Sequence, residues 1–142
     1  SCVSDVISAD AHRKLTQHAK KFPMMVLPVF KPGGYMTLLS QFQDKHWLLT
    51  FLEDFKKNPA LSSPYFVLTA YDELVSTKQI SLLRGEVFID KITKEEGRTL
   101  LHLLKLFYMS DGEAHKLLRT FNEKPREFNF ESVLNICQRQ SV

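Results

Sequence analysis

The side chains that could do chemistry in this chain are five histidines and two serines that precede a proline. The histidines are His12, His18, His46, His102 and His115. None of them belongs to an HxH or HExxH pattern or to a pair four residues apart, which are the spacings that bind zinc. Ser62 and Ser63 stand before Pro64, outside the GxSxG turn that exposes a nucleophilic serine. The sequence therefore predicts no catalytic residue and no metal site.

Cys137 and the pairs of adjacent acidic residues have structural explanations. Cys137 falls on the apolar stripe of a predicted helix, so we expect a buried, unreactive thiol. Asp72–Glu73 would point to opposite faces of a strand, and Glu95–Glu96 suit the start of a helix. We therefore expect a non-enzymatic protein without cofactors. A small enzyme with an unrecognised active site is the alternative.

The charge of the chain gives little support to a polyanion partner. Its 19 basic and 16 acidic residues leave a net charge of +3. Binding of single-stranded nucleic acid would require Lys56, Lys57 and Arg84 to converge, and it is the less favoured alternative. No apolar run approaches the roughly 20 residues that span a bilayer. We expect neither a nucleic acid nor a membrane as partner.

The first half of the chain is predicted to contain one helix and then strands. Ser8 can cap a helix that Pro23 ends, and Met24–Phe30 suits an edge strand because Pro28 lacks an amide hydrogen. A two-residue turn at Asp44–Lys45 would give a hairpin that pairs Phe42 with Trp47, Ser40 with Leu49 and Leu38 with Phe51. A second hairpin would turn near Thr77–Lys78. Its apolar face would consist of Phe66, Leu68, Ala70, Leu83, Val87 and Ile89.

Three short amphipathic helices are predicted after Lys91. The stretches Thr93–Glu96 and Ser110–Glu113 have the spacing of capping boxes, and Asn129 can cap the last helix. Three such helices can cover one face of a sheet. We therefore expect an α+β fold in which an antiparallel sheet of about five or six strands carries helices mainly on one face, plus an N-terminal helix. Residues 1–23 would form an N-terminal helical segment and residues 24–142 a single domain.

The C-terminal third resembles a known family. The residues that carry the resemblance are Leu106–Phe107–Tyr108, Asp111, Leu117, Phe121–Asn122, Pro125, Glu127–Phe128 and Ser132–Val133. Upstream, Gly34–Tyr35, Gln41–Phe42, Tyr71, Glu73–Leu74 and the stretch around Leu83–Gly85–Glu86 follow in the same order. This pattern resembles the ATP11 family, the mitochondrial assembly factors that chaperone the β subunit of F1-ATPase. The stretch LFYMSDGEAHKL (106–117) is less similar to the animal forms than FNEKPREF (121–128) is, which indicates a divergent, fungal-like member.

The resemblance implies a function that agrees with the absence of catalytic motifs. A member of this family would be a holdase of the mitochondrial matrix that binds the unassembled β subunit of F1-ATPase. It would shield the surface that the α subunit later covers, and it would need no cofactor. We expect the protein to be a monomer when free.

Two sets of residues follow as expectations. The apolar and aromatic groups on the less covered sheet face are the predicted partner-binding set: Tyr35, Leu39, Leu48, Leu52, Tyr65, Val67, Tyr71 and Phe88. The family-motif residues are predicted to be structural: Leu106, Phe107, Tyr108, Phe121, Asn122, Pro125, Glu127 and Phe128. Asn122 and Glu127 would satisfy backbone amides around the corner at Pro125. Two alternatives stay open: the N-terminal helix or the linker 55–63 covers this face, or the client adds a strand beside Met24–Phe30.

Overall fold

The computed structural model describes residues 1–140, which form one six-stranded antiparallel sheet with helices. The strands are β1 (Cys2–Ser8), β2 (Met24–Lys31), β3 (Gly34–Gln43), β4 (His46–Phe51), β5 (Pro64–Tyr71) and β6 (Ile80–Val87). The helices are α1 (Ala9–Lys21), α2 (Leu52–Lys57), α3 (Val75–Lys78), α4 (Lys94–Met109), α5 (Glu113–Glu123) and α6 (Phe130–Gln140), with a 3-10 turn at Pro125–Glu127. The strands lie in the order β1-β6-β5-β4-β3-β2.

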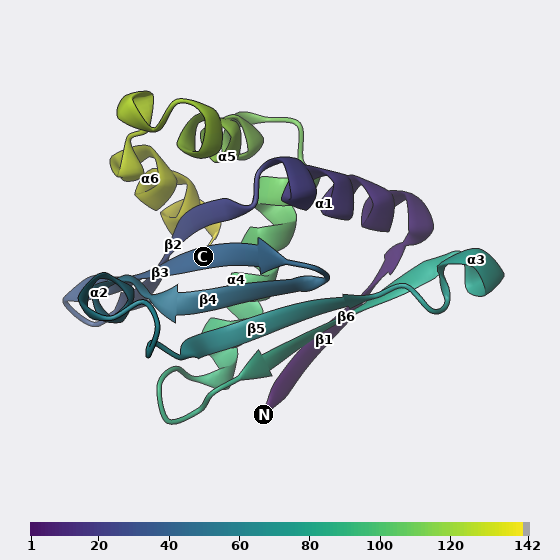
Figure 1. Cartoon of the computed structure of the whole chain (residues 1–142), viewed down its shortest axis with the longest axis horizontal. Helices are drawn as coiled ribbons and strands as arrows, with labels where there is room; N and C mark the ends of the chain where they lie inside the picture. Colours follow the sequence, from purple (N-terminus) through teal and green to yellow (C-terminus); the bar gives the residue numbers. More distant parts are fainter. Residues whose placement is uncertain (141–142) are drawn as a thin grey trace.

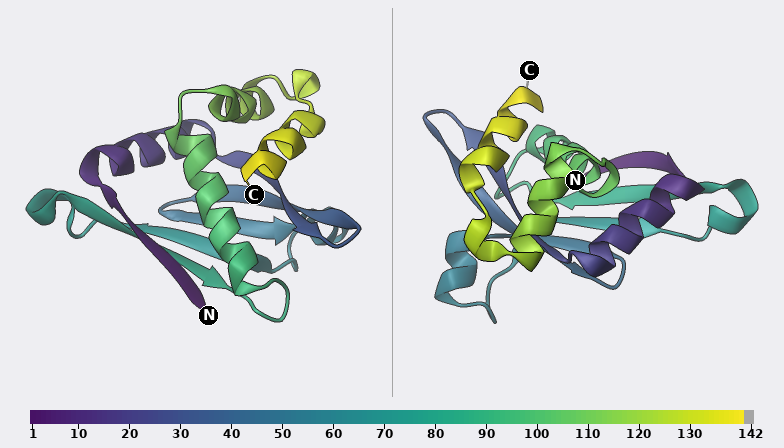
Figure 2. Two further views of the ribbon diagram at one scale, coloured as in Figure 1. Left: turned by 180° about the vertical axis from the view of Figure 1, so that it is seen from behind. Right: turned by 90° about the horizontal axis from the view of Figure 1, so that it is seen from above.

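The helices α1, α4, α5 and α6 pack on one side of the sheet. Figure 1 looks onto the opposite side, with α4 behind the strands, and the left view of Figure 2 shows α4 crossing in front of them. The short helices α2 and α3 lie at the two ends of the sheet, so neither covers its middle (Figure 1). Antiparallel sheets commonly have one packed and one solvated face. The predicted α+β class, with helices mainly on one face, is confirmed.

The hairpin of β3 and β4 has the predicted register. Leu38 pairs with Phe51, Ser40 with Leu49 and Phe42 with Trp47. The turn lies at Asp44, which adopts a left-handed φ of 61°. Aspartate tolerates this conformation better than most residues, which explains how the Asp–Lys pair can form a two-residue turn.

The hairpin of β5 and β6 has the predicted faces but a different register and connection. Phe66 pairs with Val87 and Ala70 with Leu83, two residues away from the register that a turn at Thr77–Lys78 requires. The short helix α3 replaces the predicted turn, and Gln79 reverses the chain with a left-handed φ of 58°. A shift by two residues preserves the faces because side chains alternate with a period of two. Ile89, predicted to be in this apolar face, lies beyond β6 and is 68% exposed.

The N-terminal residues form a strand that the sequence did not reveal. β1 pairs with β6 along its whole length, from Cys2 beside Glu86 to Ser8 beside Ile80. The predicted N-terminal helix follows as α1, and its buried Leu15 and Ala19 belong to the common core. The segment 1–23 therefore contributes both an edge strand and a helix of the packed layer.

The core between sheet and helices is largely aromatic. Trp47 from β4, Phe66 from β5, and Phe107 and Tyr108 from α4 are fully buried. The hydroxyl of Tyr108 donates a hydrogen bond to the carbonyl oxygen of Phe22 at 3.0 Å, and burial raises the pKa of this phenol. Burying one such side chain contributes about 2–3 kcal/mol. These contacts fix α4 across the sheet.

Three predicted helix starts are confirmed, and one is wrong. Ser8 accepts from the amide of Ala11, and Asn129 accepts from the amide of Glu131. Thr93 and Glu96 form the reciprocal capping box at α4. The second predicted box, Ser110–Glu113, does not form, because Gly112 is the residue that precedes α5 and no side chain caps it. Ser110 instead donates to the carbonyl of Leu106 and closes the end of α4.

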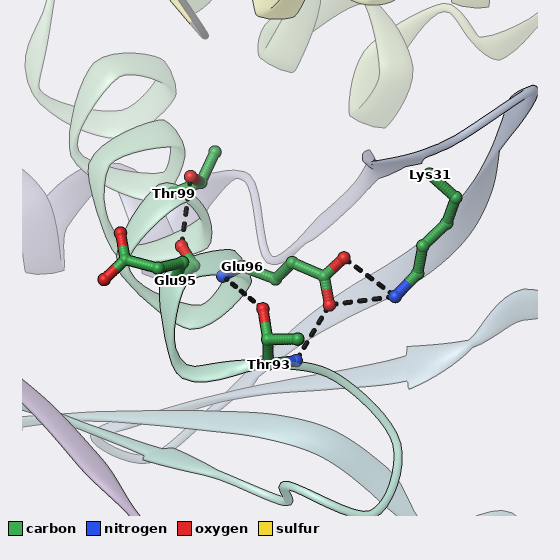
Figure 3. Close-up of polar contacts among 5 residues, drawn as sticks. All are labelled: Lys31, Thr93, Glu95, Glu96 and Thr99. Atoms are coloured by element: carbon green, nitrogen blue, oxygen red, sulfur yellow. Dashed lines mark hydrogen bonds and ion pairs between the residues drawn. The ribbon is translucent and has the colours of Figure 1, made fainter.

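The capping glutamate of α4 also holds the helix to β2. Figure 3 shows Lys31 reaching Glu96, with Nζ 2.7 Å from Oε2 and 2.9 Å from Oε1. The same carboxylate accepts the amide of Thr93 at 2.8 Å, and the hydroxyl of Thr99 donates to the carbonyl of Glu95 in the next turn. Burial alone would raise the pKa of Glu96, but the hydrogen bonds from Lys31 and Thr93 outweigh it, so this pKa lies below 4.5.

We expect this carboxylate to make stability depend on acid. A lowered pKa means that the contribution of Glu96 is fully present above pH 4.5 and is lost as the pH falls through the pKa of the folded state. Glu96→Gln should be less stable by about 1 kcal/mol at neutral pH and should lose less stability on acidification, as measured by urea unfolding. The exposed Glu95→Gln variant is the matched control. An equal loss with acid in the wild type and in Glu96→Gln would contradict this assignment.

Candidate functional site

The sheet face opposite the helix layer, here called the open face, consists of cross-strand rows. Its rows are Val26–Leu39–Thr50, Gln41–Leu48–Val67–Glu86, His46–Thr69–Arg84 and Tyr71–Leu82–Val6. Paired residues of antiparallel strands share a face, so each row runs across the sheet. The first and last rows are mainly apolar, the second has polar ends, and the third is polar, so the whole face is mixed.

The rows differ in how much surface they offer. Leu39 and Thr50 are buried, and helix α2 contacts β3 and β4, the strands on which they lie. Leu48 and Val67, in the middle of the face, are partly exposed. Val6 and Leu82 are the most exposed apolar members, at 56% and 40%. The accessible apolar groups thus lie at the centre of the sheet and at its β1 corner, on either side of the polar row His46–Thr69–Arg84.

Val6 and Leu82 were missed by the sequence analysis. They pair with each other across β1 and β6, and Leu82 also pairs with Tyr71 on β5, so the three side chains form one row. The prediction included only Tyr71 because β1 was not recognised as a strand. The alternation in Ile80–Val87 placed Leu82 on the mixed face, and this signal could have identified it.

A hollow of about 650 Å³ opens at the α2 end of the sheet. Tyr65 and Phe88 line it together with Leu61, which is 78% exposed. The phenol of Tyr65 donates to Asp54 at 3.3 Å, and burial, followed by this carboxylate, raises the pKa of Tyr65. Lysines and carboxylates both occur in the wall, so the hollow has no clear charge preference.

The predicted partner-binding residues do not all lie in one exposed patch. Leu39, Leu48, Val67 and Tyr71 lie in the rows of the open face, whereas Tyr65 and Phe88 line the hollow. Leu52 is the first residue of α2. Tyr35 is 49% exposed, but its ring contacts Phe30 and Phe130 of α6, so it reaches the helix layer rather than the middle of the open face.

The two segments that could have covered the open face, the N-terminal helix and the linker 55–63, can now be located. The N-terminal helix α1 packs into the common core on the helix side, with Leu15 and Ala19 buried there. Of the linker 55–63, residues 55–57 belong to α2, which contacts β3 and β4, and several of the later residues line the hollow at one end of the sheet. Within residues 1–140, the central rows of the open face therefore have no second layer of this chain over them.

The chain matches the model of a known protein family over most of its length. Residues 1–134 match the model of the family described as ATP11 protein. The chain belongs to the ATP11 family. The resemblance inferred from the C-terminal residues is thus confirmed, and the match extends over β1 and α1 as well.

Relatives of this ATP11-family chain occur in animals and in a fungus. The chain is 25% identical over 130 residues to the Homo sapiens protein named ATP synthase mitochondrial F1 complex assembly factor 1, covering 91% of this chain and 40% of that protein. It is 26% identical over 141 residues to the Danio rerio protein of the same name, and this match covers 99% of this chain and 47% of that protein. The Schizosaccharomyces pombe protein named Protein atp11, mitochondrial, is 24% identical over 146 residues, and this match covers 91% of this chain and 50% of that protein. The chain spans about half the length of these relatives.

Most of the ATP11-like C-terminal residues lie in or against the core. Phe107 and Tyr108 are fully buried, and Leu106 of the same helix is partly buried against the core. The rings of Phe121 and Phe128 meet edge to face at 4.8 Å on either side of the turn that Pro125 begins. These positions support the structural role predicted for the aromatic motif residues.

Asn122 has a different role from the one that we expected. Its Oδ1 accepts the amide of Met24 at 3.0 Å, and its Nδ2 donates to the carbonyl of Met24 at 2.7 Å and to that of Leu118 at 2.8 Å. The side chain thus occupies the outer edge of β2 as a neighbouring strand would. Glu127 forms an exposed ion pair with Lys124 at 4.0 Å instead of bonding the corner amides.

The reactive side chains of the described residues can be located one by one. Within residues 1–140, no three His, Cys, Asp or Glu side chains gather as metal ligands, and no helix is long and apolar enough to cross a membrane. His46 bonds to Thr69 at 2.8 Å and His102 to Gln140 at 3.0 Å. Burial raises the pKa of the Cys137 thiol to about 12, which makes it a poor nucleophile.

Proposed function

We propose that this ATP11-family chain is a non-catalytic chaperone that binds the unassembled β subunit of mitochondrial F1-ATPase. The proposal is supported by the family and by relatives named as assembly factors of the F1 complex. In this proposal the chain acts in the mitochondrial matrix, needs no cofactor, and shields the surface that the α subunit covers in the assembled complex.

The observation that carries the proposal is the open face of the sheet. Leu48, Val67 and Leu82 offer apolar contact, and they are separated by charged and polar groups such as Arg84 and Glu86. Interfaces that form and dissociate are about as apolar as the rest of a protein surface, with apolar groups concentrated at the centre. A surface that must hold an unassembled subunit and later release it has this mixed character.

Residues at both ends of the sheet extend the proposed interface. The row of Tyr71, Leu82 and Val6 forms one margin. The hollow at Tyr65 and Phe88 forms the other, and it offers a recess for a protruding side chain of the client. Partner binding by Tyr35, Leu39 and Leu52 remains part of the proposal, although Leu39 is buried and Tyr35 leans on the helix layer.

The decisive experiment is to size the chain together with isolated F1 subunits. We expect it to co-elute with the isolated β subunit without nucleotide, to suppress aggregation of that subunit at near-stoichiometric ratio, and not to co-elute with the isolated α subunit. An assembled F1 complex, in which the interface is occupied, should not bind. Binding to the α subunit alone, or to neither subunit, would overturn the proposal.

A further inference from the structure

Two histidines stack on each other where α1, α4 and α5 meet. The ring centroids of His18 on α1 and His115 on α5 are 4.2 Å apart, with the planes tilted by 31°. Each ring bonds to the last turn of α4: Nδ1 of His18 lies 2.5 Å from the carbonyl oxygen of Tyr108, and Nδ1 of His115 lies 3.1 Å from that of Phe107. Neighbouring carbonyls of one helix end therefore hold both rings.

These bonds fix where each ring carries its proton. A carbonyl oxygen only accepts, so each Nδ1 must carry the hydrogen, and Nε2 is the nitrogen with a free lone pair in the neutral ring. His115 is 8% exposed, and Phe22 packs edge-on against its ring at 5.6 Å. Two imidazolium charges in this stack would repel each other at close range and in a poorly solvated site.

The charges around the pair also oppose a second proton. Lys14 of α1 forms an ion pair with Asp111 in the connection between α4 and α5, Arg119 lies one turn further along α5, and Lys21 lies over the ring of Phe22. No basic side chain occurs in the last turn of α4. Asp111 is the one acidic group of this set, and its charge is already matched by Lys14. Burial, followed by the charges of His18 and Arg119, lowers the pKa of His115.

Besides the exposed ion pair of Glu113 with Arg139 of α6, helix α5 has two polar anchors near its ends. Near its start, His115 bonds to Phe107, and in its last turn Asn122 bonds to both backbone groups of Met24. Phe22 contacts His115 and lies two residues before Met24. The Asn122 anchor therefore attaches to the junction of α1 and β2, and the His115 anchor contacts the same junction through the ring of Phe22. If α5 loosens, the edge groups of Met24 lose their partner.

We propose that the stacked pair His18–His115 is an acid-sensitive latch, which holds α5 while at most one ring is charged and frees the Met24 edge of β2 when both rings are charged. The latch belongs to the folded chain alone and does not depend on the identity of any partner.

The test is hydrogen exchange of the α5 amides and of Met24 in the isolated protein. A lowered histidine pKa means that stability is fully present above the ordinary value of 6.5 and is lost as the pH falls below it. Between about pH 7.5 and about pH 5.5, the protection factors in α5 and at Met24 should fall roughly tenfold, while those of β4 and β5 change little. His115→Gln, which keeps a hydrogen-bond donor but cannot titrate, should abolish most of this change.

The controls separate the latch from general effects of acid. His102→Gln removes a histidine of α4 that bonds to Gln140, and it should keep the wild-type response. Asn122→Ala should expose Met24 at every pH, because it removes the other anchor. Unchanged α5 protection across this range in the wild type, or an equal loss in His115→Gln, would overturn the proposal. If His115→Gln does not fold, His18→Gln provides the same comparison.

Discussion

Replacing Leu48 and Leu82 by aspartate is expected to weaken binding of the F1 β subunit at least about 100-fold. The two residues lie in different rows of the open face, at its centre and towards the β1 corner. An apolar interface that receives two unpaired carboxylates loses the original contacts and must also desolvate the new charges. Isothermal calorimetry or pulldown with isolated β subunit measures the effect.

The fold of this double variant should persist. Neither side chain belongs to the core cluster, and Leu82 is 40% exposed in the free protein. Aspartate in a strand costs about 1 kcal/mol per site, which circular dichroism and thermal unfolding would detect as a modest shift.

The control places a carboxylate on the other side of the molecule. Asn135 is exposed on α6, so Asn135→Asp adds one carboxylate to the helix layer without touching the open face. This variant should bind like the wild type. A folded Leu48→Asp, Leu82→Asp protein that binds with wild-type affinity would remove the open face as the binding surface. The chaperone proposal itself would then depend on the sizing experiment.

Local patterns in the sequence were sufficient for the hairpins. The alternation of Phe42, Ser40 and Leu38 against Trp47, Leu49 and Phe51 fixes which side chains face the core, and a two-residue turn fixes their register. The faces of β5 and β6 were predicted for the same reason. Their register was not, because α3 extends the connection without any strong helical periodicity in four residues.

The elements that were missed depend on contacts between distant residues. β1 places Asp5 on the core side between Val3 and Ile7. This charged residue interrupts the alternation of apolar residues by which a strand is recognised. Lys105 of α4 forms an ion pair with Asp5, and this hydrogen bond lowers the pKa of that carboxyl group. Asn122 likewise bonds to Met24 from the far end of the chain. No local spacing reveals such partners, so strand β1 and the role of Asn122 required the structure.

The open face was predictable as a surface but not in its detail. Sequence patterning identified a mixed sheet face, and the helices do lie on the other side. It did not show that Leu39 is buried or that Val6 and Leu82 are the most exposed apolar residues of this face. Exposure on an uncovered sheet depends on the sizes of cross-strand neighbours and on twist, which only the assembled sheet determines.

Gly85→Ala is expected to destabilise the protein by about 2–3 kcal/mol, although alanine is ordinarily the better residue in a strand. A Cβ at this position would lie 2.5 Å from Cζ of Phe66 and 2.9 Å from Cγ2 of Val3. Phe66 is fully buried and pairs with Val87 on the neighbouring strand, so its ring has no space to move. Thermal unfolding should show a fall in Tm of roughly 5–10 °C.

A matched glycine and a second substitution test this explanation. A Cβ added at Gly34 would meet no atom within 4 Å, and this residue has no positive φ, so Gly34→Ala should change the free energy of unfolding by less than about 0.5 kcal/mol. Shortening the opposing ring with Phe66→Leu should relieve the clash, so the double variant should lose at least about 1 kcal/mol less than the sum of the single variants. Strict additivity would mean that the glycine is required for another reason. Coupling would show that Gly85, one of the residues shared with the ATP11 pattern, is needed because Phe66 packs directly on the backbone of β6.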